Sequence, residues 1–250
     1  MPIKAESPVQ KKFEPKVLSI DIECAGVQSL KADRGFVVVF GYKWVGKGPA
    51  KAITLLDYPG KDIHDDTNLL KAALSIMEEA DLVTGHFAEY FDRPYLESRL
   101  LRAGLNPLPP TRLVDTCLVA QRRLKLSSNR LGNLAEFLKV KTGKMDKRGG
   151  WPDWWMGALR GDRKSIESLA AYCKIDVECQ SQCYEAMKPI IPERYLINAA
   201  MFNNHPSCPS CGGLVQYRGF RFSMSRMFRR FQCKECGKWG NEKKSVPILK

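Results

Sequence analysis

The chain has 250 residues, enough for one substantial domain and a small appendage but not for two domains of ordinary size. Its net charge of +13 at pH 7 favours a polyanionic partner, either nucleic acid or an anionic membrane surface, over an acidic protein or a neutral metabolite. The hydrophobic content of 44% is ordinary for a globular chain, and no apolar run approaches the roughly 18 residues of a membrane span. These features exclude a largely disordered chain and a membrane-spanning one.

Residues 1–16 are predicted to form a basic flexible leader. They contain three prolines and no continuous apolar stretch that could serve as the core of a signal peptide. Of the nine cysteines, five are scattered through segments with regular patterns, which does not suggest a disulfide framework. We therefore expect a reduced, cytoplasmic protein.

The next part of the chain has the composition of β-strands. Residues 17–21 form a short apolar run, and residues 36–44 are rich in β-branched and aromatic side chains. Residues 52–56 and 82–84 are further candidate strands. These segments predict a sheet near the start of the chain.

Helical periodicity begins after Thr67, where apolar residues up to Ala80 fall on one face. Further helices are predicted at residues 94–105, 116–124, 131–140 and 162–187. This order of elements predicts an α/β domain with a mixed sheet covered by helices. Residues 141–150 are basic and contain glycine, so we expect a mobile loop there.

A change in composition follows Pro192. The main domain is predicted at residues 17–192, a connector at residues 193–204 and a separate module at residues 205–250. The module contains ten Lys and Arg residues against two Glu, so most of the net positive charge of the chain lies there.

The first group of candidate functional residues is the Asp-x-Glu sequence formed by Asp21 and Glu23, which is expected to end the first strand. Side chains alternate across a strand, so both carboxylates project from one face and can share a hard divalent cation. Taken alone, the sequence also fits a solvated strand end.

Two further aspartates precede predicted helices. Asp92 lies in a Phe-Asp-x-Pro sequence and could accept hydrogen bonds from the free N–H groups at the helix start. Asp115 follows Leu113 and Val114 and precedes the next helix, so helix capping is its expected role.

Tyr172 and Asp176 are four residues apart on a predicted helix and therefore lie on one face. They could point at the same reaction centre. The alternative is a tyrosine packed at the helix edge and an aspartate in water.

In chain order, these motifs resemble the three exonuclease motifs of the DEDD 3′–5′ exonuclease superfamily, in the subgroup with a tyrosine. The resemblance covers residues 17–192. It implies an α/β, ribonuclease H-like fold with a mixed sheet flanked by helices. It also implies two-metal-ion hydrolysis of phosphodiester bonds.

The resemblance assigns a role to each motif residue. Asp21, Glu23 and Asp176 would hold the metal ion that binds the attacking water. Asp21 and a water-linked Asp92 would support a second ion, and Tyr172 would orient or deprotonate the water. Four carboxylates in one cleft repel one another, and two Mg²⁺ or Mn²⁺ ions would relieve that repulsion and suit an all-oxygen site better than zinc.

The resemblance extends further, to small phage-encoded exonucleases that also end in a zinc module. The similar segments are residues 114–116, 128–131, 149–151, 161–162 and 172–176. One position departs from the pattern, because Phe87 stands where many relatives have asparagine. Phenylalanine cannot hydrogen-bond a nucleotide, so we expect Phe87 to be a packed core aromatic, with stacking on a terminal base as the alternative.

The C-terminal module contains two Cys-x-x-Cys pairs, Cys208 with Cys211 and Cys233 with Cys236, separated by 21 residues. Two such pairs suit a tetrahedral structural Zn²⁺ ion, because each two-residue gap forms a tight turn that aims both sulfurs at one ion. We therefore predict a small zinc ribbon that folds only when metal is bound.

Between the cysteine pairs, basic and aromatic residues are interleaved. Such a pattern can neutralise phosphates and stack on bases, which suits single-stranded nucleic acid. The predicted contacts are made by Arg218, Arg221, Arg226, Arg229 and Arg230. A small hydrophobic filling with a solvated face is the alternative.

Several other residues are expected to be structural. His205 precedes the first cysteine pair, but four cysteines already complete a zinc shell. A tryptophan cluster is expected to pack a helix, and three cysteines to be small buried side chains. These residues are Trp151, Trp154, Trp155, Cys173, Cys179 and Cys183.

The sequence thus predicts a metal-dependent 3′–5′ exonuclease acting on single-stranded nucleic acid, with DNA favoured over RNA and no membrane partner. Two other hypotheses are kept: a nucleic-acid-binding protein without turnover, and an endonuclease on the same scaffold. The oligomeric state stays open.

Overall fold

The computed structural model describes residues 15–143, 153–203, 205–223 and 226–246. The chain divides into two compact units, Lys16–Leu196 and Ile197–Lys250, which are described separately. The predicted leader and most of the predicted loop at residues 141–150 lie outside the described residues. Within the described residues, none of the helices has the length and apolar character needed to cross a membrane.

The first unit is built on a five-stranded sheet with the strand order β3-β2-β1-β4-β5. β2 pairs antiparallel with both β1 and β3, whereas β1, β4 and β5 run parallel. The prediction of a mixed sheet is therefore confirmed. The strands are β1 (Val17–Gly26), β2 (Gly35–Trp44), β3 (Lys51–Thr54), β4 (Leu82–Gly85) and β5 (Arg112–Asp115).

β1 continues beyond the carboxylates that were expected to end it, so that expectation was wrong. After a bulge between Glu23 and Cys24, the strand resumes its pairing with β2, with Cys24 opposite Val37 and Ala25 opposite Phe36. Cys24 and Ala25 are buried, so burial of apolar surface extends the strand past its polar residues. Asp21 and Glu23 therefore lie within a strand held on both sides of them.

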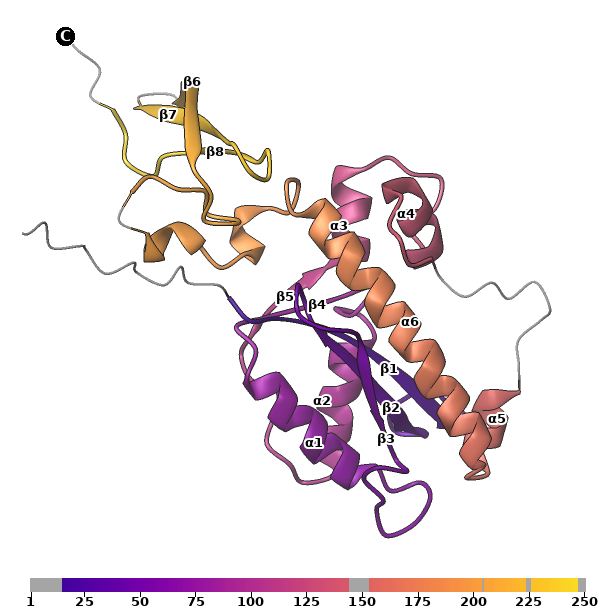
Figure 1. The fold of residues 1–250 in the computed structure, drawn as a ribbon. Coiled ribbons are helices and arrows are strands. Elements are labelled where there is room, and N and C mark those ends of the chain that lie inside the picture. Colours follow the sequence, from indigo (N-terminus) through magenta and orange to yellow (C-terminus); the bar gives the residue numbers. More distant parts are fainter. Residues whose placement is uncertain (1–14, 144–152, 204, 224–225, 247–250) are drawn as a thin grey trace, which may run out of the picture. The chain divides into compact units, whose positions relative to one another are not determined.

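Helices cover both faces of the sheet (Figure 1). The long helix α6 crosses β1, β2 and β3 on one face, whereas α1 and α2 lie against the other. The helices are α1 (Thr67–Glu78), α2 (Asp92–Arg102), α3 (Thr116–Arg123), α4 (Leu131–Leu138), α5 (Trp154–Leu159) and α6 (Arg163–Met187). The flanking helices on a mixed sheet confirm the predicted fold class.

α6 lies very close to β2 at Gly41. A Cβ atom at this position would lie 2.5 Å from Cys173 Sγ and 2.9 Å from Val177 Cγ2, which is too short for a relaxed contact. Gly41 pairs with Asp21 across the β1–β2 ladder. The missing side chain therefore lets α6 approach the strand that carries the carboxylates.

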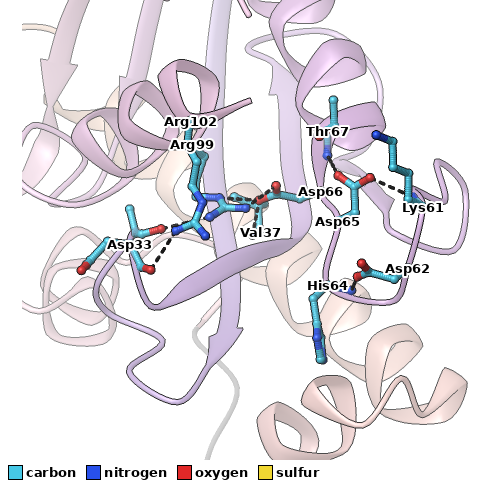
Figure 2. Close-up of polar contacts among 11 residues, drawn as sticks. Asp33, Val37, Lys61, Asp62, His64, Asp65, Asp66, Thr67, Arg99 and Arg102 are labelled. Atoms are coloured by element: carbon cyan, nitrogen blue, oxygen red, sulfur yellow. Dashed lines mark hydrogen bonds and ion pairs between the residues drawn. The ribbon is translucent and has the colours of Figure 1, made fainter. Parts of the chain in front are cut away.

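On the face of the sheet away from α6, a buried ion pair connects α2 with the start of α1 (Figure 2). Arg99 of α2 donates from Nη2 to Asp66 Oδ1 at 2.7 Å and from Nε to Oδ2 at 2.9 Å. Asp66, directly before α1, also accepts a hydrogen bond of 2.8 Å from the backbone N–H of Val37 in β2. Arg99 further donates to the carbonyl of Ala32, so one cluster links two helices, the sheet and a loop.

The second unit contains a three-stranded antiparallel sheet with the order β6-β7-β8. The pairing of β6 and β7 is irregular between Tyr217 and Phe220. Gly219 lies in this irregular segment and has a left-handed backbone, with a φ of 84°. The strands are β6 (Val215–Ser223), β7 (Arg226–Cys233) and β8 (Trp239–Asn241). Two short 3₁₀ helices, η1 (Glu193–Tyr195) and η2 (Ala199–Phe202), lie on either side of the division between the units.

Candidate active site and zinc site

Asp21 and Glu23 lie on the face of β1 that α6 covers. One carboxylate oxygen of each residue and Sγ of Cys173 all lie within 4.8 Å of one another. Cys173 is on α6, so the group joins the strand to the helix across the close contact at Gly41. The sequence predicted the two carboxylates but treated Cys173 only as a small buried side chain.

The other two predicted carboxylates act on the same centre. Burial raises the pKa of Asp21 well above its usual value, and the nearby charges of Asp92, Glu23 and Asp176 raise it further. Asp176 is buried on α6, one turn after Tyr172. Asp92 and Asp176 do not belong to the close group of Asp21, Glu23 and Cys173, but they lie near enough for their charges to act on Asp21.

Asp92 connects α2 to β1. Its Oδ1 accepts a hydrogen bond of 2.9 Å from the backbone N–H of Ile22, which lies between Asp21 and Glu23. Burial, with a contribution from the charge of Asp115, raises the pKa of Asp92 to about 7. Of the two readings of Asp92, capping and a place in the carboxylate group, the structure therefore favours the second.

Asp115 has the capping role expected from the sequence, and a second role besides. Its Oδ1 accepts hydrogen bonds from Cys117 N at 2.9 Å and Leu118 N at 3.1 Å at the start of α3. The same carboxylate also accepts from Phe87 N and Glu89 N, each at 3.0 Å. It therefore holds the turn between β4 and α2 as well as the helix.

Tyr172 keeps its proton in this environment. Burial raises the pKa of its phenol well above the ordinary value, and the charges of Asp176 and Glu23 raise it further. A protonated phenol can donate or accept a hydrogen bond but is a poor base. A phenol that keeps its proton is suited to orienting a water molecule.

Trp155 contacts the carboxylate group, which the sequence analysis missed. Its indole Nε1 donates to Glu23 Oε2 at 3.1 Å, and its ring meets that of Tyr172 edge-on, with centroids 6.0 Å apart. Trp154 and Trp155 both pack against the hydrophobic core, as expected. Trp151 lies outside the described residues. The sequence analysis predicted no helix at α5, so it could not tell which of the neighbouring tryptophans faces the carboxylates.

Phe87 is not a packed core aromatic, and that expectation was wrong. Its side chain is 47% exposed. The turn begins at the C-terminal end of β4, and the two hydrogen bonds to Asp115 hold it so that the ring faces solvent. Neighbouring His86 instead contacts Thr116 Oγ1 and the carbonyl of Asn129, each at 2.9 Å.

The carboxylate group fits divalent cations. Its buried oxygens repel one another, as the raised pKa of Asp21 shows, and a cation held among them would remove that repulsion. Carboxylate oxygen is the donor that Mg²⁺, Mn²⁺ and Ca²⁺ prefer. Asp21 and Glu23 lie close enough together to share one ion, and Asp92 and Asp176 are the nearby carboxylates that could complete the site.

The four predicted zinc ligands meet in the second unit. The sulfurs of Cys208, Cys211, Cys233 and Cys236 lie within 4.8 Å of one another, with Cys208 Sγ 3.7 Å from Cys236 Sγ and Cys211 Sγ 3.5 Å from Cys233 Sγ. Four sulfurs bound tetrahedrally at a Zn–S distance of about 2.3 Å would be roughly 3.8 Å apart. His205 is outside this group, in keeping with the structural role expected for it.

Backbone N–H groups support the sulfurs. Ser210 N donates to Cys208 Sγ and Gly213 N donates to Cys211 Sγ, each at 3.4 Å. Burial raises the pKa of Cys208, Cys211 and Cys236 to about 11. Bound zinc would offset this cost, because it favours the thiolate form.

The predicted arginine contacts all lie on the hairpin formed by β6 and β7. The five side chains are exposed, namely Arg218, Arg221, Arg226, Arg229 and Arg230. Arg229 lies over the ring of Tyr217, 5.5 Å from its centroid, and Arg230 lies over Trp239 at 5.0 Å. Consecutive residues of a strand point to opposite faces, so both faces of the hairpin carry positive charge beside an aromatic ring.

The sheet order and the flanking helices define a ribonuclease H-like fold. The chain belongs to the RNase_H superfamily, because the model of that family matches residues 18–188. This match confirms the ribonuclease H-like fold predicted from the motifs.

Two further similarities concern parts of the chain. The model of the transposase zinc-ribbon domain matches residues 194–239, and with the four cysteines it shows that the second unit is a zinc ribbon. The fold is also similar to the family B DNA polymerase from the hyperthermophilic archaeon Pyrobaculum calidifontis, with a TM-score of 0.56 and 20% identity. The similar region covers 71% of this chain and 25% of the polymerase chain, so this chain spans about a quarter of that protein. A search among curated proteins found no match.

Proposed function

We propose that the protein is a metal-dependent 3′–5′ exonuclease that hydrolyses phosphodiester bonds in single-stranded nucleic acid, with DNA as the favoured substrate. The observation that supports this proposal is the close group of Asp21, Glu23 and Cys173 under α6, together with the charges of Asp92 and Asp176 that act on Asp21. The order of the motifs supports the 3′–5′ direction, because it is the order of the DEDD exonucleases. The similarity to a DNA polymerase favours DNA.

Each carboxylate would have a defined task. Asp21 is central, since the charges of the other three all act on it, and it would be shared by two Mg²⁺ or Mn²⁺ ions. Glu23 and Asp176 would complete one ion site, and Asp92 would support the other. Bound divalent cations would supply an activated water and offset the charge that develops on the attacking and leaving oxygens.

The remaining residues would position these groups. Tyr172 would orient the attacking water through its protonated phenol, because burial and the neighbouring carboxylates disfavour the phenolate. Trp155 would position Glu23 through its hydrogen bond to Oε2. The protein would act in the cytoplasm, where reduced cysteines remain available to bind zinc.

The zinc ribbon would retain the substrate strand. Five exposed arginines on β6 and β7 offer charge to phosphates, and the exposed rings of Tyr217, Phe220 and Phe222 offer surfaces to bases. Contacts of this kind do not depend on sequence. They suit an enzyme that shortens strands of many sequences.

The proposal is tested by digesting matched DNA and RNA strands, labelled at the 5′ end, with Mg²⁺ or Mn²⁺ present. A 3′–5′ exonuclease gives a ladder of labelled products that shorten progressively from the 3′ end. Asp21→Asn and Asp176→Asn should abolish cleavage while leaving binding, whereas Asp33→Asn, at an exposed position, should not affect either. Cleavage at the wild-type rate by both site variants contradicts the proposal.

A circular single-stranded substrate separates the alternatives. An exonuclease leaves the circle intact, whereas an endonuclease opens it. A gel shift without products, on linear and circular strands alike, identifies a binding protein without turnover.

A further inference from the structure

Two exposed aromatic side chains lie on the turn between β4 and α2. Phe87 is 47% exposed and Tyr90 is 60% exposed. Their ring centroids are 5.5 Å apart and the ring planes are inclined by 41°. The two rings therefore form one apolar surface open to solvent.

The turn is attached to β1 at both of its ends. At the start, a Cβ atom on Gly85 would lie 3.3 Å from the carbonyl oxygen of Ile20, so the two backbones are in close contact. At the end, Asp92 accepts the hydrogen bond from Ile22 N at 2.9 Å. Ile20 and Ile22 flank Asp21, so the aromatic pair lies on a segment that begins and ends beside the carboxylate group.

The backbone of Phe87 is in an unfavourable conformation. Its φ of 70° lies in the left-handed region, which bulky residues other than glycine rarely adopt. The buried carboxylate of Asp115 maintains this conformation by accepting hydrogen bonds from Phe87 N and Glu89 N. The backbone conformation directs the Phe87 ring into solvent. Backbone strain of this kind is typical of functional positions.

Positive charge lies next to Tyr90, one member of the aromatic pair. Tyr90 lines a cavity together with Arg122 and Arg123 at the end of α3. The same cavity contains Glu89 and Asp115, of which Asp115 is occupied by its four backbone hydrogen bonds. An aromatic surface with arginines at its border is suited to a nucleotide, whose base stacks while its phosphate meets the positive charge.

We propose that Phe87 and Tyr90 form a stacking platform for the terminal base of a single-stranded substrate whose scissile phosphate lies at the carboxylate group. This inference rests on the proposed function and adds a subsite to it. Stacking uses the face of the base, which is accessible only when the base is unpaired. The platform therefore favours an unpaired terminus and does not select among base sequences.

The first test separates a platform from a structural role. Phe87→Gly removes the ring and relieves the left-handed strain, so thermal stability should be unchanged or higher. Lys139→Gly is the matched control, because Lys139 is exposed and has a φ of 54°. A clear fall in melting temperature in Phe87→Gly alone would show that the ring supports the fold, and would overturn the proposal.

The second test measures stacking directly. A single strand carrying 2-aminopurine as its 3′-terminal base is bound to the Asp176→Asn variant, and base fluorescence is recorded. Stacking should quench the fluorescence of the terminal base, and adding Phe87→Gly should restore it and weaken binding about 5- to 150-fold. Adding Lys139→Gly should change neither reading.

A strand with an abasic 3′ terminus completes the experiment. Phe87→Gly and its parent should bind this strand equally, because no base is present to stack. Equal weakening on both strands, or quenching that does not depend on Phe87, overturns the platform. Digestion by the wild-type protein is measured in a separate assay. If the protein digests the strand but quenching does not depend on Phe87, only the stacking platform is refuted. If quenching depends on Phe87 but the strand is not digested, only the exonuclease proposal is refuted.

Discussion

The indole N–H of Trp155 donates to Glu23 Oε2 at 3.1 Å, although the two residues are 132 positions apart. The bond joins the short helix α5 to the strand that carries the first two carboxylates. The Trp155 ring also meets Tyr172 on α6 at an interplanar angle of 75°. One side chain thus fixes the positions of two residues with proposed roles in hydrolysis.

Replacing Trp155 with Phe should lower the rate of cleavage without unfolding the protein. The substitution keeps an aromatic ring against Tyr172 but removes the donor to Glu23. Hydrogen bonds to charged groups contribute about 1.5–3 kcal/mol, so the rate at saturating Mg²⁺ should fall by about tenfold or more. Trp154→Phe is the control, since Trp154 packs against the same core as Trp155, and equal rates for the two variants would contradict the prediction.

Stability without added divalent cations should fall as the pH rises through neutrality. The pKa of Asp92 is about 7 in the folded protein against an ordinary value of 3.8, and the pKa of Asp21 is also raised. A carboxyl with a raised pKa binds its proton more tightly when folded. Its contribution to stability is therefore complete below about pH 4 and is lost as the pH rises through about 7.

Mg²⁺ or Mn²⁺ should reverse this loss, so the increase in melting temperature on adding either ion should be larger at pH 8 than at pH 6. Asp92→Asn serves as the control, because its side-chain oxygen can still accept the hydrogen bond from Ile22 N but cannot titrate. A cation effect of equal size at both pH values in the wild-type protein would argue against the carboxylate site.

Gly41→Ala should both destabilise the first unit and impair cleavage. The new methyl group would lie 2.5 Å from Cys173 Sγ, so α6 would have to move away from β2. Overpacking of this kind costs about 1–3 kcal/mol. The movement also separates Asp176 from Asp21. Gly143→Ala is a suitable control because, apart from its chain neighbours, none of the described residues has an atom within 4 Å of the added methyl group. Denaturant unfolding and cleavage assays that show no difference between the two variants would exclude the packing argument.

Cys208→Ser should remove zinc from the ribbon while leaving the carboxylate unit folded. Thiolate ligands contribute directly to the folding of such small modules, and Cys208 is buried beside Cys236. Metal analysis should find one zinc ion per wild-type chain and much less in the variant. We expect retained cleavage of very short strands and weaker binding of long ones. Full zinc content in the variant would show that the four cysteines are not the ligands.

Local patterns in the sequence were enough to predict several features of the structure. The strand composition of β1 and β2, the periodicity of α6 and the capping role of Asp115 each depend on residues close together in the chain. The cysteine pairs are similar, because two-residue gaps allow little freedom to the sulfurs. The ordered motifs added the ribonuclease H-like fold, which the family match confirms.

Other features depended on contacts between distant segments. The extension of β1 to Gly26, the approach of Cys173 to Asp21, the bond from Trp155 to Glu23 and the exposure of Phe87 could not be predicted from neighbouring residues. Each is set by how helices and strands pack, and one glycine at position 41 decides how close α6 comes. The sequence alone therefore determined which carboxylates, thiols and elements are present. Only the tertiary structure decided which side chains surround them, because burial and distance arise when segments far apart in the chain pack together.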